Sequence, residues 1–188
     1  MPKLPLSPFL LDPNAEPPVR EPNAEPHAGA CAAHAPAPGR RGAMDLDASE
    51  LFVIAALRSW VAPQMHPGEV HPDWRELFRM ARVGAPAMVA FDGLMSIIAA
   101  QATRLIDVHC CRCPALGEDE GLMLRLVTAL QSGEALPALE ILGDWLPDEA
   151  TAPALLAARR FALSIAEAGL ALPRRGQVIA LHASRTLH

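Results

Sequence analysis

The segment LIDVHCCRCPALGEDE, residues 105–120, holds most of the side chains in this chain whose types could do chemistry. Cys110 and Cys113 are separated by two residues, a spacing that lets two thiolates converge on one zinc ion. His109 and Cys111 lie next to this pair and are further candidate ligands. One such pair supplies half of a tetrahedral site, so the segment predicts a zinc site that needs additional ligands.

His66 and His71 are candidates for the missing half of this site. Four residues separate them in the segment PQMHPGEVHPD, which is within the spacing of paired zinc-binding histidines. Each histidine is followed by a proline, a pattern that is also typical of turns. If both histidines are ligands, zinc ties this loop to the cysteine segment.

Other interpretations of the cysteines stay open. Cysteines in a chain rich in alanine and leucine can simply be small buried hydrophobic side chains. A thiol- or metal-dependent enzyme would use Cys110 or Cys113 as nucleophile or ligand and His109 as base, and an accessory chaperone would hand a metal to another enzyme. The acidic residues 118–120 favour a bound dication over a free thiolate, because nearby negative charge raises the pKa of a thiol. The same carboxylates are expected to face the free amides of a first helical turn.

The rest of the chain lacks the usual catalytic motifs. It contains no Gly-rich phosphate loop, no His-Glu-x-x-His and no Gly-x-Ser-x-Gly. Glu140 and Asp144 are spaced as paired carboxylates on one helix face, but no histidine accompanies them as a di-iron site requires. The arginine pairs 159–160 and 174–175 could bind an acidic partner, although such pairs are by default solvated.

Composition limits the class of protein. A chain of 188 residues with 51% hydrophobic content is sufficient for the core of one ordinary domain. The net charge of −5 disfavours unselective binding of nucleic acid, while a protein partner stays open as a candidate. We expect a cytoplasmic protein without structural disulfides, because the chain starts with no recognisable export signal.

Residues 1–43 differ in composition from the rest of the chain. Ten of the 19 prolines lie there, together with many alanines and the repeated segment PNAEP. Such a segment has too few apolar side chains to offset the entropy of ordering its backbone, so it predicts a disordered tail. A helical domain is predicted over 44–173 with a C-terminal extension over 174–188, and Met44 could also be the true translational start.

From Met44 onward, apolar residues recur at helical spacing between residues that can begin or end helices. This pattern predicts an all-α fold, a compact bundle of five to six helices joined by short loops. The expected helices span 47–61, 74–84, 86–108, 118–132, 136–145 and 148–169.

The expected helix 86–108 is apolar and about as long as a membrane span. Asp92, Ser96 and Gln101 argue against that assignment, because an unpaired carboxylate in the middle of a membrane costs about 2.5 kcal/mol or more. We therefore expect a buried central helix in which Asp92 is paired with Arg104 or with an arginine of another helix.

The cysteine segment then occupies the corner after the helix 86–108. The resulting prediction is a small helical protein, a non-enzymatic binding or regulatory module with a structural zinc site at the His-Cys-Cys-Arg-Cys corner. Zinc is the one expected cofactor.

Overall fold

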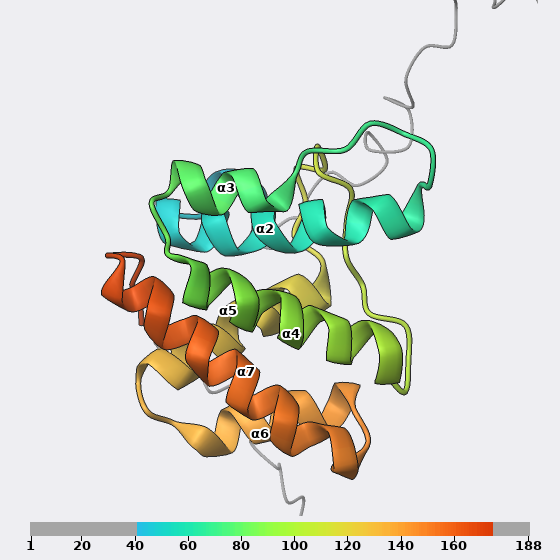
Figure 1. The fold of residues 1–188 in the computed structure, drawn as a ribbon. Coiled ribbons are helices and arrows are strands. Elements are labelled where there is room, and N and C mark those ends of the chain that lie inside the picture. Colours follow the sequence, from blue (N-terminus) through green and yellow to red (C-terminus); the bar gives the residue numbers. More distant parts are fainter. Residues whose placement is uncertain (1–40, 175–188) are drawn as a thin grey trace, which may run out of the picture.

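A computed structural model describes residues 41–174, and these residues confirm the predicted all-α bundle (Figure 1). The short 3-10 helix η1 (Ala43–Asp45) precedes six α-helices in this part of the chain. The predicted tail up to residue 40 and the extension from residue 175 lie outside the described residues. The α-helices are α2 (Ala48–Met65), α3 (Trp74–Met80), α4 (Ala85–Gln101), α5 (Glu118–Gln131), α6 (Ala135–Trp145) and α7 (Asp148–Glu167).

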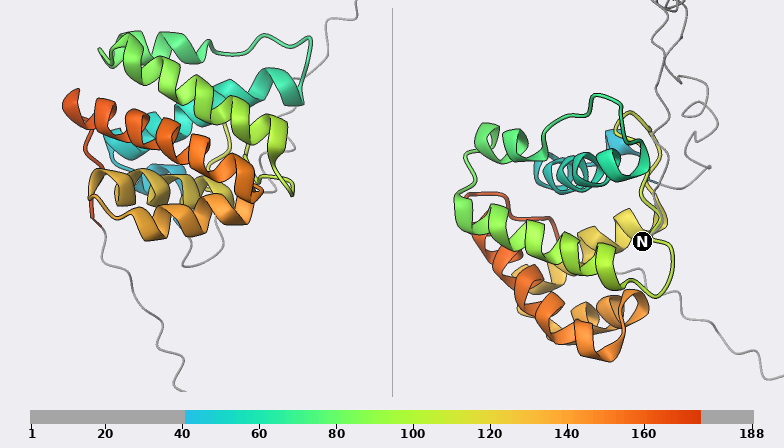
Figure 2. Two further views of the ribbon diagram at one scale, coloured as in Figure 1. Left: turned by 60° about the horizontal axis from the view of Figure 1, so that its bottom comes forward. Right: turned by 45° about the vertical axis from the view of Figure 1, so that its right-hand side comes forward.

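The helices pack around a central pair, α4 and α7, which run in opposite directions along each other (Figures 1 and 2). α2 and α3 cover one side of this pair, and α5 and α6 cover the other. An aromatic cluster fills the space between α2, α3, α4 and α7, with ring centroids 5.1 Å apart for Phe91 and Phe161. The aromatic residues of the cluster are Phe52, Trp74, Phe78, Phe91 and Phe161.

α2 begins at the predicted place but ends later than predicted. The Asp47 side chain accepts hydrogen bonds from the backbone amides of Ser49 and Glu50, and the Glu50 carboxylate accepts from the Asp47 amide. This is a capping box, which satisfies amides that have no partner inside the helix. The helix was expected to end at residue 61, but it continues through Pro63, which lies inside the last turn of α2. A proline there removes one hydrogen bond, and the turn still closes because the His66 amide donates to the Ala62 carbonyl over 3.0 Å.

α4 ends at Gln101, so the prediction of a helix up to residue 108 is wrong. Ala102 leaves the helical conformation, with φ −57° and ψ 133°, and the Thr103 amide donates to the Trp145 carbonyl over 2.9 Å. The backbone therefore leaves the helix to form a hydrogen bond with Trp145 of α6. Residues 102–117 form a loop that crosses α2 before α5 begins (Figures 1 and 2).

The partner of Asp92 is Trp60, so the predicted pairing with an arginine is wrong. The indole Nε1 of Trp60 donates to Asp92 Oδ1 over 2.8 Å, which joins α2 to α4. Arg104 lies beyond the end of α4 and pairs with Asp119 and Asp144 instead. None of the helices in residues 41–174 is long and apolar enough to span a membrane.

Candidate functional site

The three cysteines of the predicted site lie in one tight turn of the loop 102–117. The Cys113 amide donates to the Cys110 carbonyl over 3.0 Å, which closes this turn. Cys113 is buried, Cys110 is half-buried and Cys111 is exposed. The turn therefore presents its thiols to different environments.

His109 and Cys113 are brought together by this turn. His109 Nδ1 lies 3.5 Å from the Cys113 Sγ and 3.2 Å from the Ala115 carbonyl oxygen. On the other side of the ring, Nε2 lies 3.6 Å from Asp107 Oδ1. One imidazole thus lies between a thiol and a carboxylate.

The predicted structural zinc site is wrong for the residues that the structure describes. Within residues 41–174, no group of three or more His, Cys, Asp and Glu side chains is arranged to hold a metal ion. His66 and His71 shape their own loop, where His71 Nε2 lies 2.8 Å from the His66 carbonyl oxygen. The spacing of ligands within one segment does not determine whether two separate segments converge, and for this reason the sequence pattern was misleading.

A buried ion pair holds the cysteine turn to the bundle. Arg58 Nε on α2 donates to Glu120 Oε1 on α5 over 2.6 Å. Its Nη1 and Nη2 donate to the carbonyl oxygens of Cys113 and Ala115, each over 2.7 Å. Burial opposes the charge on Arg58, but the hydrogen bonds and charge of Glu120 outweigh it and raise the pKa of Arg58 above its ordinary value.

Glu120 also fixes the two ends of the segment that carries the cysteines. Its Oε1 accepts from the His109 amide over 3.1 Å, and its Oε2 accepts from the Gly117 amide over 2.8 Å. The expectation that residues 118–120 serve only the first turn of α5 is therefore incomplete. Glu118 is exposed, whereas Glu120 and Asp119 are buried. Arg58 had no signal in the sequence, because it is a single charge within the apolar run of α2.

Asp119 fixes the other part of the loop in the same way. Its carboxylate accepts from Arg104 Nη2 over 2.7 Å, from the Asp107 amide over 2.7 Å and from Trp145 Nε1 over 2.9 Å. Burial alone would raise the pKa of Asp119, but these hydrogen bonds, above all that from Arg104, lower it below its ordinary value. The pKa of Arg104 is raised by its hydrogen bonds to Asp119 and Asp144. The two buried carboxylates thus hold the loop 102–117 against α2, α5 and α6.

A separate pocket of about 410 Å³ lies where the start of the described chain meets α5, α6 and the segment after α7. Three arginines line it, Arg41, Arg125 and Arg174, and we call it the arginine pocket. Two acidic residues and a set of apolar and hydroxyl side chains complete the lining. These other lining residues are Glu50, Gly121, Leu124, Thr128, Ala129, Ser132, Glu134, Pro137 and Pro173.

The arginine pocket has hydrogen-bond donors without acceptors. Arg41 Nη2 donates to Glu50 Oε2 over 2.7 Å, but the buried Arg41 Nε has no hydrogen-bond partner in the described part of the chain. Arg125 and Arg174 are exposed, and neither forms an ion pair with another of residues 41–174. The arginine pair 174–175 was expected to be solvated by default, with an acidic partner as the alternative. Nothing in the sequence marked Arg41 or Arg125, because the three arginines come from distant segments.

The arginine pocket and the cysteine turn are connected through the backbone. The Ala43 amide donates to the Pro114 carbonyl over 2.7 Å, and Gly42 forms an isolated antiparallel bridge with Ala115. Arg41 of the pocket immediately precedes this bridge. The segment that carries Cys113 therefore supports the chain that places Arg41.

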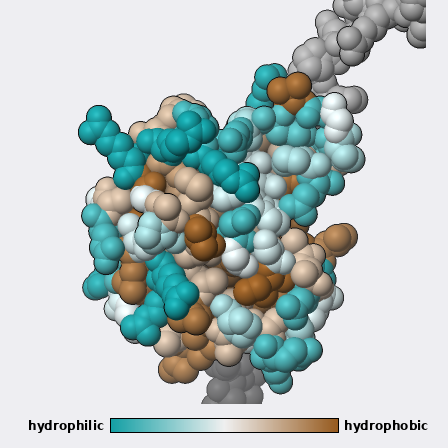
Figure 3. Space-filling view, viewed as in Figure 1, coloured by the Kyte–Doolittle hydropathy of each residue, from teal (hydrophilic) through white to brown (hydrophobic). Residues whose placement is uncertain are grey.

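The face formed by α3, α4 and α7 has a different character. Among the residues of α4 and α7, Val89, Leu156 and Leu163 are exposed. In Figure 3, the strongly hydrophobic residues of this face form separate spots among polar residues. Isolated apolar side chains of this kind are normal on a protein surface.

No protein-family model, curated protein sequence or solved structure matches this chain.

Proposed function

We propose that this chain binds an acidic segment of a partner protein in the arginine pocket. The observation that carries this proposal is that Arg41, Arg125 and Arg174, from three segments far apart in the sequence, line one pocket. Guanidinium groups bind carboxylates through short, charge-assisted hydrogen bonds. The pocket volume of about 410 Å³ is within the range of about 300–1,000 Å³ that is common for ligand sites.

The free donors support a ligand that carries a carboxylate. Arg125 and Arg174 are exposed, and no acidic side chain of residues 41–174 forms an ion pair with either of them. A bound glutamate or aspartate side chain would supply two acceptor oxygens to these two guanidinium groups. Binding would then satisfy donors that the described chain leaves without acceptors.

The rest of the lining favours a peptide over a phosphate-rich ligand. Glu50 and Glu134 place two carboxylates in the wall, and these would repel a polyanion more strongly than a single carboxylate. Leu124, Pro137 and Pro173 add apolar surface. The best match is an acidic side chain next to an apolar one, as in a peptide.

The test measures binding of a fluorescein-labelled peptide of alternating glutamate and leucine by fluorescence anisotropy. We expect saturable binding that weakens as salt is added, because salt screens partly exposed charges. Arg125→Gln is expected to weaken binding about fivefold, which corresponds to about 1 kcal/mol for a partly exposed ion pair. A peptide with glutamine in place of glutamate should not bind.

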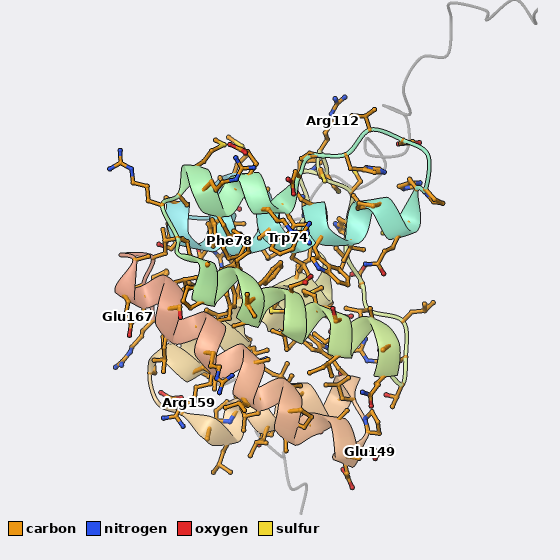
Figure 4. The ribbon with its side chains drawn as sticks, viewed as in Figure 1. Trp74, Phe78, Arg112, Glu149, Arg159 and Glu167 are labelled. Carbon is orange, nitrogen blue, oxygen red and sulfur yellow. The ribbon has the colours of Figure 1, made fainter. Side chains whose placement is uncertain are left out.

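Arg159→Gln is the matched control, because Arg159 is an exposed arginine on α7 that is not part of the pocket lining (Figure 4). It should leave binding unchanged. Equal weakening by Arg125→Gln and Arg159→Gln, or equal affinity for the glutamine peptide, contradicts the proposal. Tripolyphosphate and the unlabelled glutamate peptide are then compared as competitors of the labelled peptide. If tripolyphosphate displaces the labelled peptide at lower concentrations, the pocket is assigned to phosphate ligands instead.

A further inference from the structure

The turn from Cys110 to Cys113 holds two thiols at a separation that a disulfide can bridge. The hydrogen bond from the Cys113 amide to the Cys110 carbonyl, 3.0 Å long, joins the two ends of the turn. The end residues of such a turn have Cα atoms less than about 7 Å apart. Disulfides join Cα atoms that are about 4.4–6.8 Å apart. We propose that Cys110 and Cys113 form a reversible disulfide by exchange with a small disulfide such as oxidised glutathione.

Both ends of the turn are held from the side of the bundle. Arg58 Nη1 donates to the Cys113 carbonyl over 2.7 Å, and the His109 amide, next to Cys110, donates to Glu120 Oε1 over 3.1 Å. Arg112, between the two cysteines, extends away from the bundle (Figure 4). The intervening side chain therefore does not separate the two thiols.

The difference in exposure determines the order of the exchange steps. Cys110 is half-buried, whereas Cys113 is 4% exposed, so the small disulfide reacts first with Cys110. The Cys110 thiolate attacks one sulfur of the small disulfide, which forms a mixed disulfide and releases one small thiolate. The Cys113 thiolate then attacks the Cys110 sulfur of the mixed disulfide, which forms the internal bond and releases the second small thiolate. The two protein thiols are oxidised, and the small disulfide is reduced to two thiols.

His109 is placed to take the proton of the Cys113 thiol, because its Nδ1 lies 3.5 Å from the Sγ. The Ala115 carbonyl oxygen, which accepts from Arg58 Nη2 over 2.7 Å, is the other group near Nδ1. On the other side of the ring, Asp107 Oδ1 lies 3.6 Å from Nε2.

The disulfide would join two ends of a turn whose following backbone, residues 113–115, is hydrogen-bonded to the bundle. The Cys113 and Ala115 carbonyls accept from the buried Arg58, and the Pro114 carbonyl accepts from the Ala43 amide. The proposal rests on this turn alone and is independent of ligand binding in the arginine pocket.

The test uses the reduced full-length protein, equilibrated with mixtures of reduced and oxidised glutathione. The samples are quenched in acid, alkylated and digested after glutamate, and the peptide with Cys110 and Cys113 is analysed by mass spectrometry. We expect a form in which this peptide has lost two hydrogens and neither Cys110 nor Cys113 is alkylated. Dithiothreitol should convert it back completely.

Single substitutions decide which sulfurs are joined. Cys111→Ser should retain the oxidised form, whereas Cys113→Ser should lose it and accumulate glutathione on Cys110. If the unsubstituted protein forms only glutathione adducts, or if its disulfides involve Cys111 or Cys31 to the same extent, the proposal is overturned.

Discussion

Replacement of Glu120 by glutamine tests whether the ion pair with Arg58 holds the cysteine turn to the bundle. The Glu120 side chain is 0% exposed, and its two oxygens accept four hydrogen bonds, two from Arg58 and one each from the His109 and Gly117 amides. Glutamine has the same shape, but one of its terminal groups is an NH2 donor. At least two of the surrounding donors would then face a donor. The charge of Arg58, whose side chain is 4% exposed, would lose its only buried counter-charge among the described residues.

The expected loss of stability is a large part of the total. Removal of one partner from a buried ion pair costs about 3–5 kcal/mol, whereas domains of ordinary size are stable by about 5–15 kcal/mol. With a denaturant dependence of about 2 kcal/mol per molar urea, the urea midpoint should fall by about 1.5–2.5 M. Circular dichroism of the helices during urea titration of the unsubstituted protein and of Glu120→Gln measures this shift.

Glu76→Gln is the control. Glu76 forms an ion pair with Arg79 on α3, and both side chains are exposed. An exposed pair contributes about 0–1 kcal/mol, so this control should lower the midpoint by about 0.5 M at most. The reasoning about a buried ion pair is refuted if Glu120→Gln shifts the midpoint no more than Glu76→Gln.

A double substitution, Arg58→Met with Glu120→Leu, separates the charges from the hydrogen bonds. Replacement of a buried ion pair by apolar side chains is often neutral or stabilising in other proteins. Here the same replacement should remain destabilising, because each buried backbone group that loses its partner costs about 1–3 kcal/mol. Stability equal to that of the unsubstituted protein would show that these bonds do not hold the turn. The backbone groups concerned are the carbonyls of Cys113 and Ala115 and the amides of His109 and Gly117.

Two further predictions concern the same loop. Gly117→Ala should destabilise the protein, because a Cβ at this position would lie 2.7 Å from the Asp107 carbonyl oxygen. Gly143→Ala, which has open space around it in α6, should instead stabilise the protein by about 0.5–1 kcal/mol. Thermal unfolding of both variants measures this difference. The lowered pKa of Asp119 in the folded state means that its carboxylate stabilises the fold above the unfolded pKa of about 3.9, and that this contribution is lost as the pH falls through the folded value. The stability difference between the unsubstituted protein and Asp119→Asn should therefore be largest near neutral pH and shrink below about pH 4, and a difference that is constant with pH in urea titrations would contradict the role of Asp119.

The helices whose signals are local were predicted closely. The expected segments 118–132 and 136–145 correspond to α5 (Glu118–Gln131) and α6 (Ala135–Trp145). Their apolar residues recur at helical spacing, and Gly133 takes a positive φ of 79° between them, which favours glycine at a helix end. Periodicity and end signals are properties of a few neighbouring residues, so they can be read without knowledge of the fold.

The end of α4 and the arrangement around the cysteines could not be predicted in this way. α4 stops at Gln101 because the Thr103 amide has a partner on Trp145, 42 positions further along the chain. Nothing in the apolar pattern of 86–108 marks this stop. The three cysteines were recognised as a cluster, but their exposure depends on the ion pair that holds their turn.

The sequence by itself determined the all-α class, most helix bounds and the position of the cysteine turn between two helices, because these follow from periodicity and from the conformational limits of glycine and proline. The tertiary structure decided which charged groups are buried together. Arg58 and Glu120 are 62 positions apart, and Trp60 and Asp92 are 32 positions apart. It also brought Arg41, Arg125 and Arg174 to one pocket. A buried charge needs a partner of opposite charge or hydrogen-bond donors, but the partner is selected by the packing of whole helices and not by its distance along the chain.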